Sequence, residues 1–553
     1  MKRVAMSLAN VVLDAGAVTR CRRRVHWEHD PAAPDLEPLP ENPATEQRKA
    51  DAQAHRAAVT KLLAQYFPRS AWVAVPTDAE PDERIAATVA ALEAGVDVVS
   101  GGLLPVDQEA GRRGGAELLV RTPGGYVPVI IVRHRVTDPG EGALTTALTD
   151  LNPDNARVDP ARRVRSQPRD QFRLAHVVEL LRAAGHADPD RVVGGVIGMD
   201  ADVVLWHDLL APSFPGEKST MQEYAERFAD RLAVASAAAS GAEPLAQPSR
   251  IVACRYCPWW QVCEPMLHER QDVSLVVRGD DAMVLRDAGY PTVSALAAAD
   301  PAADPPPVML TGTTFQNAVA LARGWQAGLS VVRKVRQIEI PRGDVEVDVD
   351  MESFVDYGAY LWGTLLTGAD IGLPRDYRAF GTWEPLPTDD EARSFAEFWA
   401  WFSDVRARAA ARGLTFRAYC YNAMAENRWL LGSAERFAGM PGIPSVAEVQ
   451  EFVESDEWVD LFVSVSESFL CAEGKGLKVI ARIAGYEWHD PEAGGEASMR
   501  WYREAVGLTN GAPDLAQRAR LLRYNEDDVR ATHTLREWMT GAAMTEIPYY
   551  GDL

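Results

Sequence analysis

The pattern of apolar and polar positions divides the first half of the chain into helices and strands. Apolar residues recur every three or four positions over 46–66, 82–94, 169–184 and 224–240, which predicts four helices. Apolar runs at 116–121, 127–136 and 191–197 predict strands, and the turn-rich segment 138–163 predicts a loop. We therefore expect a mixed α/β domain over residues 1–271.

The pattern changes between residues 272 and 336. Residues 284–300 predict two helices separated by a tight turn at Gly289, followed by the proline-rich stretch 301–310. From residue 337 strands and helices alternate again, with two strand-like stretches joined at Arg342 and Gly343 and helices expected over 390–412, 427–438 and 516–539. The sequence thus predicts an α/β protein in three parts, 1–271, 272–336 and 337–553.

The second of these strand-like stretches alternates apolar and acidic residues. Successive side chains of a strand point to opposite faces, so Asp348, Asp350 and Glu352 are expected on one face. Three neighbouring carboxylates repel one another unless a cation lies between them, although such alternation is also typical of a solvated strand face. Farther on, Tyr524 and Asp528 are four residues apart in a predicted helix and so share a face.

The composition excludes some classes of protein. The 553 residues carry a formal net charge of −22, which argues against nonspecific coating of nucleic acid. No apolar run is long enough to span a membrane, and Asn10 and Asp14 interrupt the apolar start of the chain. We therefore expect a cytoplasmic protein that contacts no membrane.

Three of the six cysteines lie close together in a C-x2-C-x5-C run formed by Cys254, Cys257 and Cys263. A four-thiolate centre needs one more, and of the remaining cysteines Cys21 is the best candidate. Thiolates suit zinc or an iron–sulfur cluster. The alternative is three buried cysteines without a metal.

Several motifs of the C-terminal part resemble those of RNase H-like exonucleases of the DEDD type, tyrosine subgroup, and most closely the YprB branch. They are D-x-E at Asp350 and Glu352, Tyr421-Asn422, W-V-D-L at 458–461, the segment 476–488, and Y-N-x-x-D at 524–528. The resemblance implies two Mg²⁺ or Mn²⁺ ions held by Asp350, Glu352, Asp460 and Asp528, with Tyr524 orienting the attacking water. The family usually has an aspartate where this chain has Glu426 and Asn427, so Glu426 is an alternative ligand to Asp460.

The N-terminal part resembles RecB-type PD-(D/E)xK nucleases with an iron–sulfur clip. The resemblance implies a [4Fe–4S] cluster on Cys21, Cys254, Cys257 and Cys263. His55 and Glu117 match two positions of the nuclease motif, but the next strand has no carboxylate at the [D/E]-x-K position, so this domain is expected to be inactive. Residues 284–300 resemble half of a helix-hairpin-helix module, which contacts phosphates, and are equally typical of a helical linker.

These resemblances imply a metal-dependent 3′–5′ exonuclease that acts on single-stranded or end-containing DNA in repair or recombination. Two alternatives remain open, a ribonuclease and a nucleic-acid-binding scaffold without catalysis. No residue of the sequence distinguishes RNA from DNA.

Overall fold

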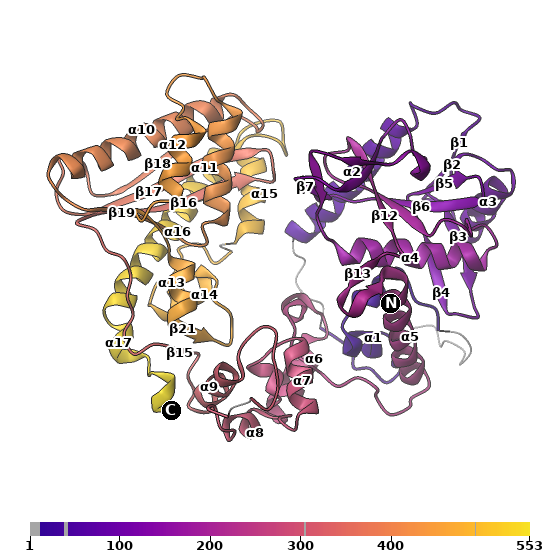
Figure 1. The fold of residues 1–553 in the computed structure, drawn as a ribbon, viewed down its shortest axis with the longest axis horizontal. Helices are drawn as coiled ribbons and strands as arrows, with labels where there is room; N and C mark the ends of the chain where they lie inside the picture. Colours follow the sequence, from indigo (N-terminus) through magenta and orange to yellow (C-terminus); the bar gives the residue numbers. More distant parts are fainter. Residues whose placement is uncertain (1–10, 38–42, 304–305, 493) are drawn as a thin grey trace. The chain divides into compact units, whose positions relative to one another are not determined.

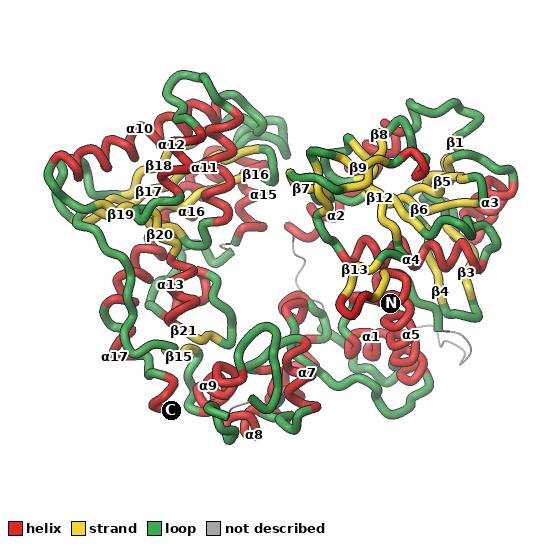
Figure 2. The backbone as a smooth tube through the Cα atoms, viewed as in Figure 1, coloured by secondary structure: helices red, strands yellow, loops and turns green. Residues whose placement is uncertain are grey.

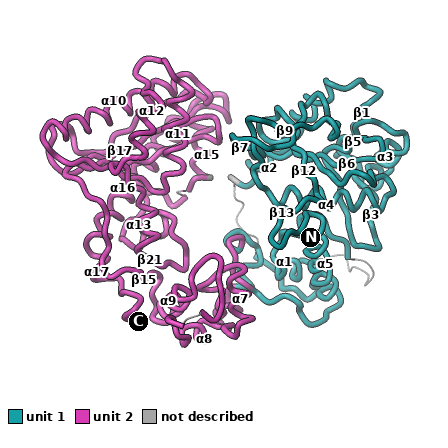
Figure 3. Tube along the Cα trace, in the orientation of Figure 1, with its two compact units in different colours: residues 1–248, 254–263 teal, residues 249–253, 264–553 magenta. Residues whose placement is uncertain are grey.

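We analysed a computed structural model, which describes residues 11–37, 43–303, 306–492 and 494–553. The first ten residues, part of the apolar start of the chain, lie outside that description. The chain forms two compact units: residues 1–248 with 254–263, and residues 249–253 with 264–553 (Figure 3). Both combine helices with mixed sheets, so the expected α/β class is confirmed (Figures 1 and 2).

The first unit is built on an eight-stranded sheet with the order β1-β2-β5-β6-β11-β12-β8-β9. Pairs β1–β2 and β6–β11 are parallel, and the other neighbours are antiparallel. Its helices are α1 (Arg22–His29), α2 (Pro43–Leu63), α3 (Pro81–Glu93), α4 (Pro168–Ala183) and α5 (Thr220–Ala239). The strands are β1 (Trp72–Ala74), β2 (Val98–Ser100), β3 (Leu103–Asp107), β4 (Arg112–Gly115), β5 (Leu118–Thr122), β6 (Gly125–Ile131), β7 (Thr137–Pro139), β8 (Ala143–Ala147), β9 (Arg157–Asp159), β10 (Arg162–Val164), β11 (Val193–Ile197), β12 (Val203–Asp208), β13 (Pro212–Phe214) and β14 (Lys218–Ser219).

Both faces of this sheet are covered. Along β6, Tyr126 and Ile130 pack in a core with residues of α4, while Val129 and Ile131 pack in another with residues of α2. A strand buried on both faces reads as an apolar run rather than an alternation. That explains why β6 was recognised in the sequence.

The second unit contains a five-stranded sheet with the order β18-β17-β16-β19-β20. Strand β16 is antiparallel to β17 and parallel to β19. Strands of this unit are β15 (Val331–Arg333), β16 (Val345–Phe354), β17 (Gly358–Gly368), β18 (Tyr377–Gly381), β19 (Phe416–Cys420), β20 (Trp458–Asp460) and β21 (Phe469–Cys471). The helices are α7 (Asp280–Asp287), α8 (Val293–Ala297), α9 (Phe315–Gln326), α10 (Asp390–Ala411), α11 (Met424–Arg436), α12 (Val446–Val453), α13 (Leu461–Ser468), α14 (Leu477–Ile483), α15 (Gly495–Ala505), α16 (Leu515–Thr540) and α17 (Ala543–Glu546), while α6 (Trp260–Glu269) begins in the first unit.

Strand β16 has two chemically different faces. Val345, Val347 and Val349 pack in a core with aromatic residues of α10. The acidic residues between them face α16, whose side chains bond Asp348 and Asp350. The predicted alternation is therefore confirmed, but its acidic face is covered by a helix instead of water.

Most predicted helices and strands are confirmed within a few residues, including α7 and α8 around Gly289, whose φ is +93°. Two predictions are wrong. The segment 138–163 contains strands, of which β8 and β9 extend the main sheet. The stretch before Arg342 does not form a strand. Its apolar residues Ile338 and Ile340 instead pack in a core with residues of α16 and α17.

Candidate metal-binding active site

Three carboxylates from two distant segments meet in the second unit. Asp350 and Glu352 come from β16 and Asp528 from α16, and one ligand oxygen of each lies within 4.8 Å of the others. Among the described residues no other group of three such side chains meets this limit. All three were candidate metal ligands in the sequence.

Asn525 fixes how α16 lies against the strand. Its Nδ2 donates to Asp350 Oδ2 at 2.8 Å, and its Oδ1 accepts from the Tyr377 hydroxyl at 2.7 Å. Gly363 stands directly opposite Asp350 on β17, and a Cβ there would lie 1.7 Å from Asn525 Oδ1. The glycine therefore leaves the space that Asn525 occupies.

Lys478 and Trp488 complete the surroundings of Asp528. Trp488 Nε1 donates to Asp528 Oδ1 at 2.7 Å, and Lys478 Nζ lies 3.8 Å from Oδ2. Lys478 also donates to the Tyr524 hydroxyl at 2.7 Å. Lys478, Trp488 and Asn525 had no role assigned from the sequence, although they lie in the motifs at 476–488 and 524–528.

The carboxylates disturb one another electrostatically. Burial and repulsion by Asp528 and Glu352 raise the pKa of Asp350 well above its usual range. Burial and the Asp528 charge raise the pKa of Glu352 to about 8, against a partial opposing effect of Lys478. Clustered, buried oxygen ligands of this kind fit a hard divalent cation, which would remove the repulsion.

Glu426 and Asp460, the two candidates for a fourth carboxylate, differ in their partners. Glu426 on α11 is buried, its Oε2 has no hydrogen-bond partner among the described residues, and burial raises its pKa to about 8. Its charge also acts on Asp350. Such an oxygen is available to a cation.

Asp460 has its oxygens engaged elsewhere. Both accept backbone amides, from Asn422 at 2.9 Å, Ala423 at 3.0 Å and Phe462 at 2.9 Å. It thereby caps α13 and holds the turn at Asn422, whose φ is +69°. Asn427, where the family usually has an aspartate, accepts a hydrogen bond from Trp458 Nε1 at 2.8 Å.

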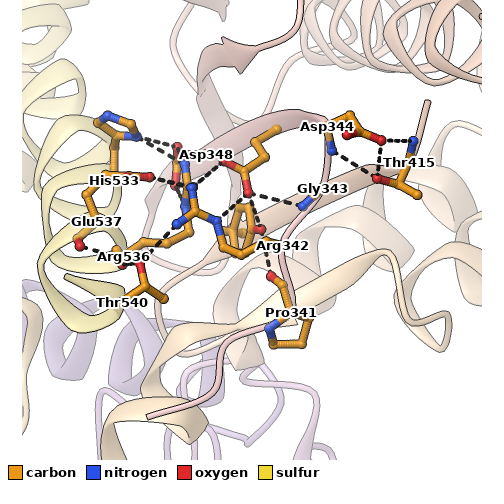
Figure 4. A network of polar contacts seen from close by, with 12 residues as sticks. Pro341, Arg342, Gly343, Asp344, Asp348, Thr415, His533, Arg536, Glu537 and Thr540 are labelled. Atoms are coloured by element: carbon orange, nitrogen blue, oxygen red, sulfur yellow. Dashed lines mark hydrogen bonds and ion pairs between the residues drawn. The ribbon is translucent and has the colours of Figure 1, made fainter. Parts of the chain in front are cut away.

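Asp348 does not join the carboxylate cluster, because it forms an ion pair with the buried Arg536. Arg536 Nη2 lies 2.8 Å from Asp348 Oδ2, both side chains are 0% exposed, and Arg536 also pairs with Glu346 (Figure 4). The cation expected beside Asp348 is therefore a guanidinium. Hydrogen bonds from Arg342 and the charge of Arg536 outweigh burial and lower the pKa of Glu346 to about 2.

A cavity of about 420 Å³ adjoins Tyr524. It is lined by His489, Asp490, Pro491, Glu492, Arg520, Arg523, Tyr524 and Asp527. Asp527 holds one wall, because it accepts from Tyr486, from the His489 amide and from His489 Nδ1 at 2.7–3.0 Å. Arg520 and Arg523 give this cavity two cations, of which Arg520 pairs with Asp490 and Glu492.

In the first unit, the nuclease-like positions are engaged in ordinary contacts. Glu117 Oε1 lies 2.6 Å from Arg173 Nη2, and Oε2 accepts from the Ile131 amide at 3.4 Å. His55 Nε2 lies 3.2 Å from the Gly198 carbonyl.

The cysteine-containing segment 254–263 belongs to the first unit, although its neighbours on both sides belong to the second. The Trp27 and Trp259 rings stack with centroids 5.7 Å apart, and Cys21 begins the helix that carries Trp27. Cys21 and Cys257 are close enough to Cys263 to influence its thiol, whose pKa burial raises to about 11. Three thiolates on one zinc would stand about 3.8 Å apart, and no three of the four cysteines have sulfurs within 4.8 Å of one another.

Residues 440–540 match the RNase_H superfamily. This segment contains Asp460, Lys478, Tyr524 and Asp528, while Asp350, Glu352 and Glu426 precede it. No characterised protein and no solved structure gives a significant match to the chain. The comparisons thus support a nuclease-type domain that uses divalent metals and acts on nucleic acid. No described helix combines the length and apolar character needed to cross a membrane.

Proposed function

We propose that the protein is a metal-dependent 3′–5′ exonuclease that acts on single-stranded or end-containing DNA in repair or recombination. The observation that carries the proposal is the convergence of Asp350, Glu352 and Asp528. The 3′–5′ direction rests on the resemblance to the tyrosine subgroup of DEDD exonucleases, of which the Tyr524 and Asp528 pair is the signature.

We assign the fourth ligand position to Glu426, because its Oε2 is buried without a partner, and a positioning role to Asp460. The four carboxylates would hold Mg²⁺ or Mn²⁺, which when bound neutralise charge on a scissile phosphate and lower the pKa of water. Tyr524 Oη, held by Lys478 Nζ at 2.7 Å, is placed to orient the attacking water. The Lys478 ammonium adds positive charge on the same side.

The test is hydrolysis of end-labelled DNA and RNA single strands by the full chain with Mg²⁺ or Mn²⁺. We expect release of nucleotides from the 3′ end of DNA, loss of activity with chelator, and a decrease on the order of 10²–10⁴ in Asp350→Asn. Asp376→Asn is the matched control, because Asp376 is 75% exposed and lies outside the cluster. Preference for RNA would favour a ribonuclease, and binding without cleavage under any divalent ion would favour a scaffold.

We further propose that the first unit, which resembles RecB-type nucleases, has no catalysis of its own. Arg173 neutralises Glu117, and the end of β6 supplies only the Ile131 amide to it. Glu117→Ala should therefore leave cleavage nearly unchanged. Loss of cleavage in Glu117→Ala but not in Asp350→Asn would assign the chemistry to the other unit.

Finally, we propose a [4Fe–4S] cluster on Cys21, Cys254, Cys257 and Cys263. The support is the packing of the segment 254–263 into the first unit and the mutual influence of Cys21, Cys257 and Cys263. Anaerobically purified protein should contain iron and sulfide and absorb broadly near ~400 nm. Cys21→Ser should abolish this absorption and Cys471→Ser should not, whereas stoichiometric zinc without iron would exclude the cluster.

A further inference from the structure

The first unit contains a cavity of about 720 Å³ that the proposed chemistry does not use. Its walls come from α2, from the ends of β1 and β2 with the residues that follow them, from α3, and from α4. Binding pockets for small ligands commonly measure about 300–1,000 Å³, so this volume admits a ligand of nucleotide size.

Four cations line the cavity. Arg56 and Lys61 project from α2, and neither forms an ion pair with another described residue. Arg84 donates to the Gly101 carbonyl at 3.0 Å through Nη2. Its Nε is buried and has no hydrogen-bond partner among the described residues. Only Arg173 is neutralised, by Glu117.

This charge is unusual for the protein as a whole. The chain carries a formal net charge of −22, yet the lining has an excess of positive groups with Glu117 as its carboxylate. Two cations of α2 without an ion-pair partner among the described residues, which line the same cavity as Arg84, are suited to an anion rather than to internal ion pairs. Arginine and lysine are both common ligands of phosphate groups, to which they donate charge-assisted hydrogen bonds.

The rest of the lining is largely apolar. Ala57, Val75, Leu103 and Ala116 contribute small or aliphatic surfaces, and Trp72 offers an aromatic ring. An anion alone gains nothing from such a surface. A nucleobase does, because stacking on an aromatic side chain contributes about 1–3 kcal/mol per base.

We propose that this cavity binds a phosphorylated nucleotide, either free or as one unit of a nucleic-acid strand. The base lies against the apolar wall with Trp72, and the phosphate contacts Arg56, Lys61 and Arg84. The proposal concerns binding in the first unit and does not depend on catalysis in the second.

The experiment measures binding by the full chain in EDTA, so that no divalent ion supports binding at the carboxylate cluster. The probes are a fluorescent 5′-phosphorylated single-stranded DNA, followed by anisotropy, and deoxyadenosine monophosphate and inorganic phosphate, each followed by calorimetry. Arg56→Gln/Lys61→Gln removes two charges from the cavity. Lys49→Gln/Arg182→Gln removes two exposed charges of α2 and α4 outside it and is the matched control.

We expect the cavity variant to bind at least about tenfold more weakly to whichever nucleotide probe the wild type binds, because it cannot form the charge-assisted hydrogen bonds to the phosphate. If the strand is the ligand, the slope of log affinity against log salt should decrease by about 1 for each phosphate-binding cation removed. The control variant should bind like the wild type. Binding of deoxyadenosine monophosphate alone would identify a free nucleotide as the ligand.

Equal binding by the cavity variant and the control would overturn the proposal. Inorganic phosphate binding as tightly as the nucleotide would overturn the assignment of the apolar wall to a base. Cleavage at the second unit is scored separately, with a p-nitrophenyl ester of thymidine monophosphate and Mn²⁺. Loss of binding with unchanged ester hydrolysis supports the cavity, whereas absent hydrolysis in the wild type counts against the exonuclease only.

Discussion

Metal binding at the carboxylate cluster should depend steeply on pH. In the metal-free protein the pKa of Glu352 and of Glu426 is about 8, compared with 4.5 for an ordinary glutamate. Below pH 8 both side chains are therefore mostly protonated in the folded protein. A divalent cation needs them ionised, so binding must displace about two protons from Glu352 and Glu426, and more if Asp350, whose pKa is also raised, holds one.

The magnitude follows from these two protons. Each displaced proton costs about 1.4 kcal/mol per pH unit below the pKa, so the two from Glu352 and Glu426 should lower the affinity for Mn²⁺ by about 100-fold for each unit of acidification well below pH 8, and a proton on Asp350 adds to this effect. The stability of the metal-free protein should depend on pH in the opposite direction from the metal affinity. Because the folded pKa values are raised, the metal-free protein should lose stability as the pH rises from about 4.5 to 8.

The assay is calorimetric titration of Mn²⁺ into the full chain between pH 6.5 and 9, in buffers of different ionisation enthalpy. We expect release of at least about two protons at pH 7, from Glu352 and Glu426 together with any proton on Asp350. Glu426→Gln should reduce this number by about one, because the glutamine amide holds no titratable proton, while Glu454→Gln on the exposed end of α12 should leave it unchanged. Affinity independent of pH, or an unchanged proton count in Glu426→Gln, would refute the assignment of these ligands.

Two further predictions concern side chains beside the cluster. Tyr524→Phe should reduce turnover less than Asp350→Asn does, because it removes the hydrogen bond from Lys478 but no ligand, and single-turnover cleavage rates would show this. Arg536→Met should destabilise β16 by about 3–5 kcal/mol, since it leaves the buried Asp348 with only His533, 3.4 Å away, and hydrogen exchange of β16 amides measures the loss. Arg342→Gln is the control for that variant, because Arg342 is 37% exposed and Glu346 retains its ion pair with Arg536 when Arg342 is replaced. An equal loss of stability in both variants would contradict the reasoning.

Local periodicity was sufficient to predict much of the second unit. The alternation at 345–353 follows from the geometry of a strand and correctly placed Asp350 and Glu352 on one face. The spacing of Tyr524 and Asp528 follows from helix geometry in the same way. Periodicity was less informative over 138–163, where short strands rich in turn residues complete the sheet edge.

Which carboxylates meet was decided by packing between distant segments. The sequence offers Asp348 in the same row as Asp350, but Arg536, 188 residues later, pairs with it and leaves Asp350 and Glu352 facing Asp528. The sequence likewise left Glu426 and Asp460 as alternatives. Backbone amides of the turn after β19 occupy Asp460 and leave an oxygen of Glu426 without a partner.

The sequence by itself therefore determined the α/β class, the faces of the main elements and the chemical types at the candidate site, since these depend on neighbours along the chain. The tertiary structure alone decided which carboxylates converge, the position of Lys478 beside Tyr524, and the cationic cavity of the first unit. Arg56 and Lys61 look like surface charges of a helix in the sequence. Only the folded chain brings them to the same cavity as residues of β1, α3 and α4, because convergence depends on contacts between residues far apart in the chain.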